Sequence, residues 1–333
     1  MLPEEGGGSV DLASTAQFES PSVWRSPSSW SACEAMMLIP AILCVAPGAE
    51  HLAAGLTQET GIPLASVSWR RFPDGEICAR VETTLTDRDV FIVQGTHQNQ
   101  CLRLEELYQL VDVAASQGAR RICCVVPYLA FSRQDRRMHV GEPLSGLIVL
   151  RTLAMLGAQS CATIDVHSAE LFEHAPLPCT SLSSASVFAD WLLRHEFRDP
   201  LLISPDAGGL QRIQALSALT NFAAAACSKY KDTDGYTWYA EEDLDVQGRD
   251  IIVMDDICSS GSTIIPLMQL LRGKGARRLC YAVTHFSANG DLLLAKVGFS
   301  IHIIASESIP SPQACVPITP LICEWIRETR SAV

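Results

Sequence analysis

Two adjacent acids, Asp255 and Asp256, separate an apolar run from a loop of small residues in the stretch IIVMDDICSSGSTIIPL. A carboxylate can accept two hydrogen bonds, and the two hydroxyls of a sugar cis-diol can donate them. The loop 259–263 carries only small or hydroxylated side chains, so a phosphate could approach its backbone N–H groups and the positive end of a following helix. The segment therefore predicts a site for a ribose phosphate. Taken alone, the acid pair could also form a strand-end turn exposed to solvent.

The chain around this loop predicts the elements that would hold it in place. Residues 251–254 are typical of a central strand in a parallel sheet, and ligands of such sheets bind beyond the carboxyl ends of the strands. Ser262 or Thr263 could cap the helix that follows, and Pro266 is tolerated in its first turn. The inner face of that helix is expected to consist of Leu267, Leu270 and Leu271.

Short apolar runs alternate with helix-period segments along the rest of the chain. We expect strands at 41–45 and 90–94 and helices at 50–58 and 102–116. The repeated order of strand, helix and strand indicates parallel sheets that helices cover on both faces.

A short internal echo indicates that the chain contains two similar halves. Residues 118–123 read GARRIC and residues 275–280 read GARRLC, each after a helical pattern and before an apolar run. Gly118 and Gly275 would end the helices, and the arginine pairs would stay in water before each strand enters the core. Chance similarity of two ordinary turns is the alternative, but the order of elements on both sides favours duplication. The predicted fold class is therefore α/β, with two similar domains that each hold a mostly parallel sheet flanked by helices.

Length and composition limit the classes of function. At about 100–200 residues per domain, the 333 residues suggest two domains, and the 48% hydrophobic content is enough for sizeable cores. A net charge of −12 argues against a general nucleic-acid binder, which would carry a basic face. The 13 cysteines form no CxxC pair, which predicts reduced thiols in a cytoplasmic protein. No apolar run approaches the roughly 18 residues that a membrane span needs.

The first residues differ in composition from the rest. Residues 1–36 are rich in Gly, Ser and Pro and predict a disordered tail. The apolar stretch 36–46, MMLIPAILCVA, could imitate the core of a signal peptide. However, it begins well inside the chain and no basic segment precedes it, so we do not expect a secretion signal.

Two further segments carry residues that could bind a nucleotide. In RFPDGE, Phe72 could stack on a base while Asp74 and Glu76 accept its amino hydrogens, although a PDG turn between strands is common. In SRQDRR, which follows an apolar run, Arg133 could meet a phosphate and Gln134 a base or ribose. On its own this segment would more often be a surface turn.

Three other segments bear on metal binding and catalysis. His167 in TIDVHSAE follows an apolar strand, where a histidine is either packed in the core or a ligand. Asp206 in SPDAGGLQR offers the hard oxygen that Mg²⁺ prefers. The segment CSKYKDTD, which contains Lys229 and Lys231, is typical of a solvated hairpin when it is considered alone.

The order of these segments resembles that of the ribose-phosphate pyrophosphokinases, also called PRPP synthetases. The similarity covers residues 38–320 and rests on RFPDGEICARVE, VVPYLAFSRQDRR, GEPLSGLIVLRTLAMLGA, TIDVHSAE, SPDAGGLQR and DDICSSGST. It implies two phosphoribosyltransferase-type domains and an enzyme that transfers the diphosphoryl group of ATP to O1 of ribose 5-phosphate. The products would be AMP and PRPP, which serves nucleotide, histidine and tryptophan biosynthesis.

The resemblance also implies a division of the chain, a cofactor and an assembly. Residues 37–183 would form the ATP-side domain, residues 184–320 the domain that binds ribose 5-phosphate, and residues 321–333 a tail or helix. Mg²⁺ would be the cofactor. Subunits of a homo-oligomer would share the ATP site, because the hairpin of Phe72 would reach into a neighbouring subunit.

Each motif receives a role from the resemblance. ATP would be bound by Phe72, Asp74 and Glu76, which would hold its adenine, and by Arg133 and Gln134. Mg²⁺ would be held by His167 and Asp206. The catalytic residues would be Lys229 and Lys231. Ribose 5-phosphate would be bound by Asp206, Asp255, Asp256, Ser259, Ser260, Gly261, Ser262 and Thr263.

Three of these positions depart from the family pattern. Ser260 stands where a threonine is usual and keeps the hydroxyl, whereas Ser262 replaces a small residue, often glycine, and restricts the backbone. Lys231 stands where an arginine is usual and lacks the planar fork of a guanidinium. Two alternatives stay open. A phosphoribosyltransferase would share DDICSSGST but would not need RFPDGE or SRQDRR, and a non-catalytic regulatory subunit would fit the replaced arginine.

Overall fold

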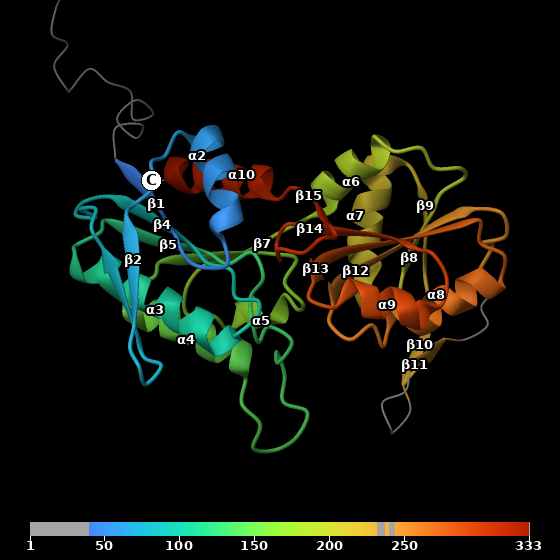
Figure 1. The fold of residues 1–333 in the computed structure, drawn as a ribbon, viewed down its shortest axis with the longest axis horizontal. Helices are drawn as coiled ribbons and strands as arrows, with labels where there is room; N and C mark the ends of the chain where they lie inside the picture. The colour runs from blue at the N-terminus through green and yellow to red at the C-terminus, as the bar shows by residue number, and fades with distance from the viewer. Residues whose placement is uncertain (1–39, 232–236, 240–243, 333) are drawn as a thin grey trace, which may run out of the picture. The chain divides into compact units, whose positions relative to one another are not determined.

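The computed structural model describes residues 40–231, 237–239 and 244–332, and the predicted tail over residues 1–36 lies outside this range. Within the described residues, two main parallel sheets follow one another along the chain, each between layers of helices (Figure 1). We call residues 40–183 the N-terminal half and residues 184–318 the C-terminal half. The predicted α/β class with two similar halves is confirmed.

The sheet of the N-terminal half has the order β1-β4-β5-β6-β7, and all its neighbouring strands are parallel. Alternate residues of each strand belong to two apolar clusters, since successive side chains point to opposite faces. Phe91 lies in one cluster and Ile92 in the other. The strands are β1 (Ala41–Val45), β4 (Asp89–Val93), β5 (Arg121–Val125), β6 (Ser160–Ile164) and β7 (Cys179–Leu182).

Helices cover both faces of this sheet. The short helix η2 (Glu50–Leu52), α2 (Ala53–Thr60) and the C-terminal helix α10 (Thr319–Ser331) bury their apolar residues on one face. The helices α3 (Gln100–Ser116) and α4 (Ser145–Leu156) pack on the other, and α5 (Glu170–Glu173) follows β6. Trp325 of α10 meets the ring of Phe91 edge-on at 6.3 Å, so the end of the chain returns to the N-terminal half.

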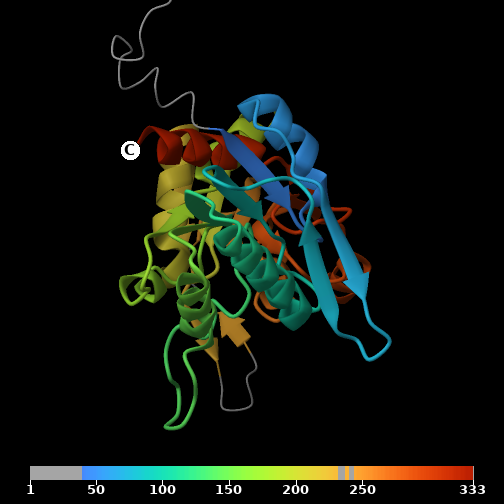
Figure 2. The same ribbon diagram turned by 90° about the vertical axis from the view of Figure 1, so that its left-hand side faces the viewer.

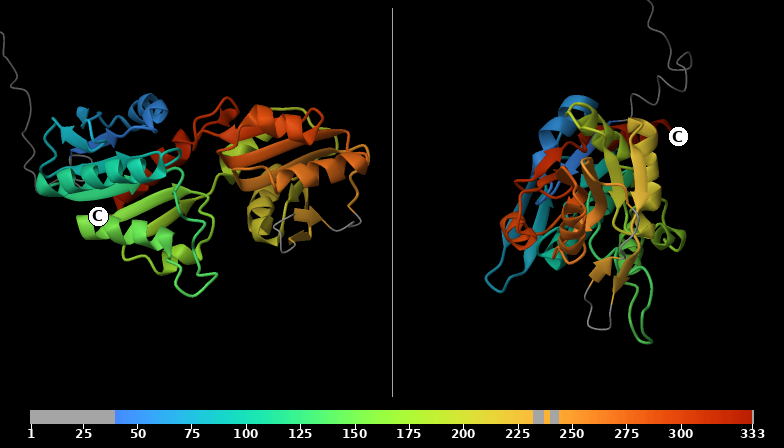
Figure 3. Two further views of the ribbon diagram at one scale, coloured as in Figure 1. Left: turned by 60° about the horizontal axis from the view of Figure 1, so that its bottom comes forward. Right: turned by 90° about the vertical axis from the view of Figure 1, so that its right-hand side faces the viewer.

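The sheet of the C-terminal half has the order β15-β14-β13-β12-β8-β9 and is also parallel. Its strands are β8 (Leu201–Ser204), β9 (Ala223–Ala226), β12 (Asp250–Cys258), β13 (Arg278–Phe286), β14 (His302–Ser306) and β15 (Ala314–Val316). The helices around it are α6 (Ala185–Leu193), η3 (Ala207–Gly209), α7 (Leu210–Thr220), α8 (Ile264–Gly273) and α9 (Gly290–Val297). Figure 3 shows α6 and α7 on one side of this sheet and α8 and α9 on the other.

Each half also contains an antiparallel hairpin, which precedes the strand that begins with the buried acid. The hairpin of β2 (Val67–Arg71) and β3 (Ile77–Val81) comes before β4 and extends away from the first sheet (Figure 2). The hairpin of β10 (Lys229–Lys231) and β11 (Thr237–Tyr239) comes before β12.

The two halves repeat one unit in register. Asp89 opens β4 opposite Arg121 of β5, and Asp250 opens β12 opposite Arg278 of β13. Both carboxylates are 1% exposed. The arginines that hold them are Arg120 and Arg121 in the first half and Arg277 and Arg278 in the second, at 2.5–2.9 Å.

The predicted exposure of the arginines holds in part, since the side chains of Arg277 and Arg278 are 43% and 41% exposed, but their acidic partners were not predicted. A buried carboxylate at the start of a strand is costly unless it is paired, and the two arginines supply that pairing. The predicted role of the glycines is confirmed, because Gly118 and Gly275 follow α3 and α8 with φ of 75° and 88°.

The strand that carries the acid pair is longer than predicted. β12 continues past residue 254 to Cys258, because β13 runs alongside it until Phe286 pairs with Cys258. Asp255 and Asp256 lie inside the strand, so their side chains point to opposite faces of the sheet. The next helix starts at the predicted place, after Thr263, but within the described residues the Thr263 side chain makes no capping hydrogen bond.

None of the helices in the described ranges combines the length and the apolarity that crossing a bilayer requires.

Candidate active site

Side chains from the two halves meet at the carboxyl ends of the strands. His167, three residues beyond β6, holds the carboxylate of Asp256 on β12 with a 2.6 Å distance from Nδ1 to Oδ2. Arg133, beyond β5, donates a long hydrogen bond of 3.5 Å to the hydroxyl of Ser259. The residues predicted for the ATP side therefore lie against residues predicted for the ribose side.

The two acids have opposite ionisation preferences. Burial and the neighbouring charge of Asp256 raise the pKa of Asp255 to about 8. Burial also opposes ionisation of Asp256, but the hydrogen bond from His167 and the positive charge of Arg212 outweigh it and lower the pKa of Asp256. The hydrogen bond to Asp256 raises the pKa of His167. Asp256 and His167 thus form a charge-assisted pair, while Asp255 favours its neutral form.

The loop after β12 has the backbone that a phosphate site requires. Gly261 has a φ of +80°, and a Cβ there would lie 2.4 Å from Cδ1 of Leu293, so only glycine fits. The hydroxyl of Ser260 accepts a hydrogen bond from the N–H of Ser262 at 3.3 Å and donates one to its hydroxyl at 3.1 Å. These contacts hold small polar groups at the amino end of α8, where an anion is favoured.

A lysine reaches the acid that follows β8. Asp206 accepts a hydrogen bond from the N–H of Gly209 at 3.3 Å and forms a salt bridge with Nζ of Lys229 at 2.9 Å. Lys229 opens the β10–β11 hairpin, so the hairpin and the loop after β8 are joined here. Lys231 lies in the same strand, but its side chain is outside the part of the chain that the structure describes.

A cavity of about 340 Å³ adjoins His167. It carries both charged and neutral polar groups, which suits a polyphosphate and its counter-cation. Its lining residues are Arg133, Gln134, Asp135, Arg136, Met138, Glu142, Pro143 and His167. Two of the predicted ATP-binding residues thus share a cavity with a predicted metal ligand.

The tip of the β2–β3 hairpin stands apart from this cavity. The Arg70 guanidinium lies over the ring of Phe72 at 4.2 Å, and Asp74 and Glu76 are exposed. None of the three predicted adenine-binding residues is among the described residues that line the cavity.

The sequence did not indicate a role for three residues beside the site. Asp165, with a φ of 36°, accepts hydrogen bonds from Ser184 and from Thr284, and lies 3.8 Å from Nε of Arg212. Both Asp165 and Arg212 lie inside motifs already quoted, TIDVHSAE and SPDAGGLQR, and this position was the available signal. Tyr239, whose hydroxyl donates to the carbonyl of Thr263 at 3.0 Å, follows a segment with no such motif.

The residues present fit Mg²⁺ as the partner of a nucleotide better than as a fully caged ion. Among the described residues, no group of three or more His, Cys, Asp or Glu side chains could hold a metal by itself. Mg²⁺ usually takes one or two protein ligands and completes its shell with water and substrate phosphates. His167 and Asp206 are the predicted ligands, and in this structure they contact Asp256 and Lys229 respectively.

Comparison with known proteins identifies the family of the chain. The N-terminal domain of ribose phosphate pyrophosphokinase matches residues 42–157. A ribose-phosphate pyrophosphokinase of Granulibacter bethesdensis is 31% identical, over 84% of this chain and 93% of the relative. One of Methanopyrus kandleri is also 31% identical, over 83% and 94%.

The fold agrees as well. The crystal structure of a phosphoribosylpyrophosphate synthetase from Mycobacterium smegmatis superposes with a TM-score of 0.78 at 22% identity. The superposition covers 88% of this chain and the whole of the Mycobacterium smegmatis chain. From the sequence match to the curated relatives, the chain belongs to the ribose-phosphate pyrophosphokinase family.

Proposed function

We propose that this chain transfers the β,γ-diphosphoryl group of ATP to O1 of ribose 5-phosphate, giving PRPP and AMP. The observation that carries the proposal is the pairing of His167 with Asp256, which places the Arg133 cavity against the acid pair and the small-residue loop. One substrate would occupy each side of this contact. The bond from O1 to the β-phosphorus forms, the bond from that phosphorus to the AMP oxygen breaks, and the hydroxyl proton leaves to solvent.

The chain's own residues would act by binding and by balancing charge. The backbone of the loop 259–263 would hold the 5-phosphate, and the two acids of β12 would hold the ribose hydroxyls. Arg133 and Lys229 would balance the negative charge that moves onto the leaving oxygen. No side chain needs to become a nucleophile, because the sugar hydroxyl attacks and the protein supplies position.

Mg²⁺, held by His167 and Asp206, would neutralise the phosphate oxygens of ATP when it is bound. Asp206 also pairs with Lys229, so one carboxylate would contact both the metal and the proposed catalytic lysine. ATP binding by Gln134 and the adenine contacts of Phe72, Asp74 and Glu76 complete the proposed set.

The proposal extends to the assembly and the compartment. Because the Phe72 hairpin tip is exposed and separate from the Arg133 cavity, we propose that it completes the ATP site of a neighbouring subunit. We propose a cytoplasmic location, since buried thiols such as those of Cys123 and Cys124 in the apolar core suit a reducing compartment. We propose a domain boundary near residue 183, since β7 ends the first sheet and α6 then leads into the second.

The decisive experiment is an assay of AMP release from ATP, with ribose 5-phosphate and Mg²⁺, on the wild-type chain and on Lys229→Ala. We expect Lys229→Ala to lower turnover by about 10²–10³-fold while ribose 5-phosphate affinity changes little. Lys296→Ala, which removes an exposed lysine of α9, is the matched control and should keep full turnover. Near-normal turnover in Lys229→Ala would refute the assigned role, and absence of AMP release from the wild type would refute the function.

A further inference from the structure

The structural repeat places a second crevice opposite the candidate active site. Tyr128 lies seven positions after Arg121, and His285 lies seven positions after Arg278, the equivalent arginine of the second half. The ring centroids of Tyr128 and His285 are 5.0 Å apart. Equivalent residues touch each other only where a pseudo-twofold axis passes. Every contact between the halves on one side of this axis should therefore have a counterpart on the other.

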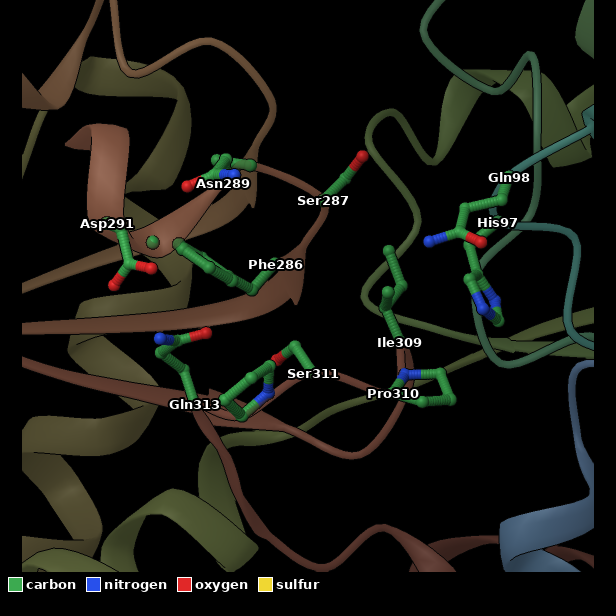
Figure 4. A pocket seen from close by; sticks show the side chains of 13 residues that line it. His97, Gln98, Phe286, Ser287, Asn289, Asp291, Ile309, Pro310, Ser311 and Gln313 are labelled. Carbon is green, nitrogen blue, oxygen red and sulfur yellow. The ribbon is translucent and has the colours of Figure 1, made fainter.

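A cavity of about 550 Å³ occupies that opposite side (Figure 4). The loop after β4 lines it with His97 and Gln98, as the loop after β12 lines the candidate active site with Ser259. The loops after β13 and β14 form its other wall, as the loops after β5 and β6 do in the candidate site. This wall includes Asn289, Gly290, Asp291, Ser311 and Gln313.

Counting along the paired strands shows which charges the second crevice lacks. Gly290 is the equivalent of Arg133, because it lies twelve residues after Arg278, as Arg133 does after Arg121. By the register of β6 and β14, Ile309 is the equivalent of His167. Gly95 stands at the position of Asp256. A Cβ at residue 95 would lie 2.2 Å from the carbonyl oxygen of Gly48, so no acid fits there.

The second crevice also lacks the phosphate loop. Eleven positions separate Asp89 from the first residue of α3, whereas fourteen separate Asp250 from the first residue of α8. The N-terminal half thus has no room for an equivalent of residues 259–263. The described lining also contains no Lys or Arg that could balance the charge of a phosphate.

Neutral hydrogen-bonding groups take the place of the charges. Gln98 faces Asn289 and Gln313 across the cavity, and the hydroxyl of Ser311 is buried without a partner among the described residues (Figure 4). Burial, with the charge of Arg103, lowers the pKa of His97, so this imidazole is neutral near pH 7. Asp291 is the one formal charge in the described lining.

From these groups we infer that the second crevice binds an uncharged, hydroxyl-rich small molecule of the nucleoside or free-sugar class. Amides and hydroxyls both donate and accept, so they match a sugar that does the same. The cavity has the size typical of small-ligand sites, about 300–1,000 Å³. Occupation of this site needs none of the residues that the proposed reaction uses.

Calorimetric titration of the full chain with adenosine and with D-ribose tests the inference. The catalytic site is first saturated with ribose 5-phosphate, Mg²⁺ and a non-hydrolysable ATP analogue. We expect one adenosine per chain to bind under these conditions. Binding of D-ribose with similar affinity would identify the free sugar as the recognised part, and binding of adenosine alone would identify the nucleoside.

The variants Gln98→Met and Gln313→Met remove one amide each and keep the side-chain length. Each should weaken adenosine or ribose binding about tenfold or more, because buried ligand hydroxyls lose their partners. Gln58→Met, on the exposed surface of α2, is the matched control and should bind like wild type. Retained AMP release by all three variants shows that they are folded.

Two results would overturn the inference. One is that neither probe binds the saturated wild-type chain. The other is that the probe binds with equal affinity to wild type and to both cavity variants, which would place it elsewhere. Either result leaves the proposed reaction untouched, because its readout is AMP release.

Discussion

Asp255 and Asp256 are neighbours in the sequence but have different surroundings, because consecutive residues of a strand point to opposite faces. Asp256 faces His167 and is stabilised as an anion. Asp255 accepts the N–H of Asp256 at 3.0 Å, yet its burial still favours the protonated form. In the substrate-free protein, the ionised Asp256 can therefore accept a hydrogen bond from a hydroxyl, whereas Asp255 carries a proton near neutral pH.

This difference predicts how stability depends on pH. Asp255 has an ordinary pKa of 3.8 and a folded pKa of about 8, so the folded state binds its proton more tightly. The stability this provides is complete below pH 3.8 and is lost as the pH rises through 8. We expect Asp255→Asn to gain stability relative to wild type between pH 5 and 9, by at most about 1.4 kcal/mol per pH unit.

Urea unfolding of both proteins at pH 5, 7 and 9 measures the effect. Asp291→Asn, an identical change at an exposed acid of α9, should show no such trend with pH. A constant difference between Asp255→Asn and wild type would contradict the assigned proton.

Gly261 gives a second prediction at the scale of one residue. Gly261→Ala would place a methyl group 2.4 Å from Leu293 and force an unfavourable φ of +80°. The loop must then shift, and we expect KM for ribose 5-phosphate to rise about tenfold or more. Gly298→Ala separates the two causes, since its φ is +83° but nothing lies within 4 Å. It should cost only the strain, about 1–2 kcal/mol, and leave KM unchanged.

At the scale of elements, the β10–β11 hairpin connects the proposed catalytic lysine to the proposed phosphate loop. Lys229 and Tyr239 are cross-strand partners. Lys229 reaches Asp206, and the Tyr239 hydroxyl donates to the carbonyl of Thr263 just before α8. Burial raises the pKa of Tyr239, so the hydroxyl keeps its proton. The hairpin is thus fastened to the phosphate loop through one hydrogen bond.

Tyr239→Phe removes that bond and little else. The loss of about 1 kcal/mol should lower turnover about fivefold, with a smaller effect on ribose 5-phosphate affinity. Steady-state AMP release measures both parameters. Tyr230→Phe is the control, because Tyr230 stacks on Trp238 at 4.5 Å on the exposed side of the hairpin. Equal turnover in the two variants would show that the Tyr239 hydroxyl does not position the lysine.

Elements were predictable where local chemistry determines them. The apolar runs gave β1 with its observed bounds and β4 within one residue, and the glycines marked the ends of α3 and α8. The extension of β12 through the acid pair depends on the length of β13 beside it, which no local pattern records. The contacts of the arginine pairs were not predicted, because their partners, Asp89 and Asp250, lie about 30 residues earlier.

For the candidate site, the sequence likewise predicted single residues but not the contacts between them. Motifs named the residues of each half, but the contact between His167 and Asp256 joins positions 89 residues apart. Arg212 and Asp165 required the folded arrangement of both halves, and Tyr239 lies in a hairpin without a recognisable motif.

At the scale of the whole molecule, the exposed β2–β3 hairpin would join the subunits of the proposed oligomer. The tip residues Phe72, Asp74 and Glu76 lie outside the described cavity that contains Arg133. If the tip completes a neighbour's site, each active site combines Phe72 from one chain with Lys229 from another. A chain that lacks Phe72 and a chain that lacks Lys229 could then form an intact active site together.

Mixing Phe72→Ala with Lys229→Ala tests this arrangement. Each variant alone should release little AMP. After the subunits of an equal mixture are exchanged, about a quarter of the sites should hold one intact tip and one intact lysine, so about a quarter of wild-type activity should return. A mixture of Lys229→Ala with Asp256→Ala should stay inactive, because one chain supplies both residues to a site. Activity of the first mixture no higher than that of its parents would place Phe72 in the site of its own chain and remove the structural reason for an obligatory oligomer.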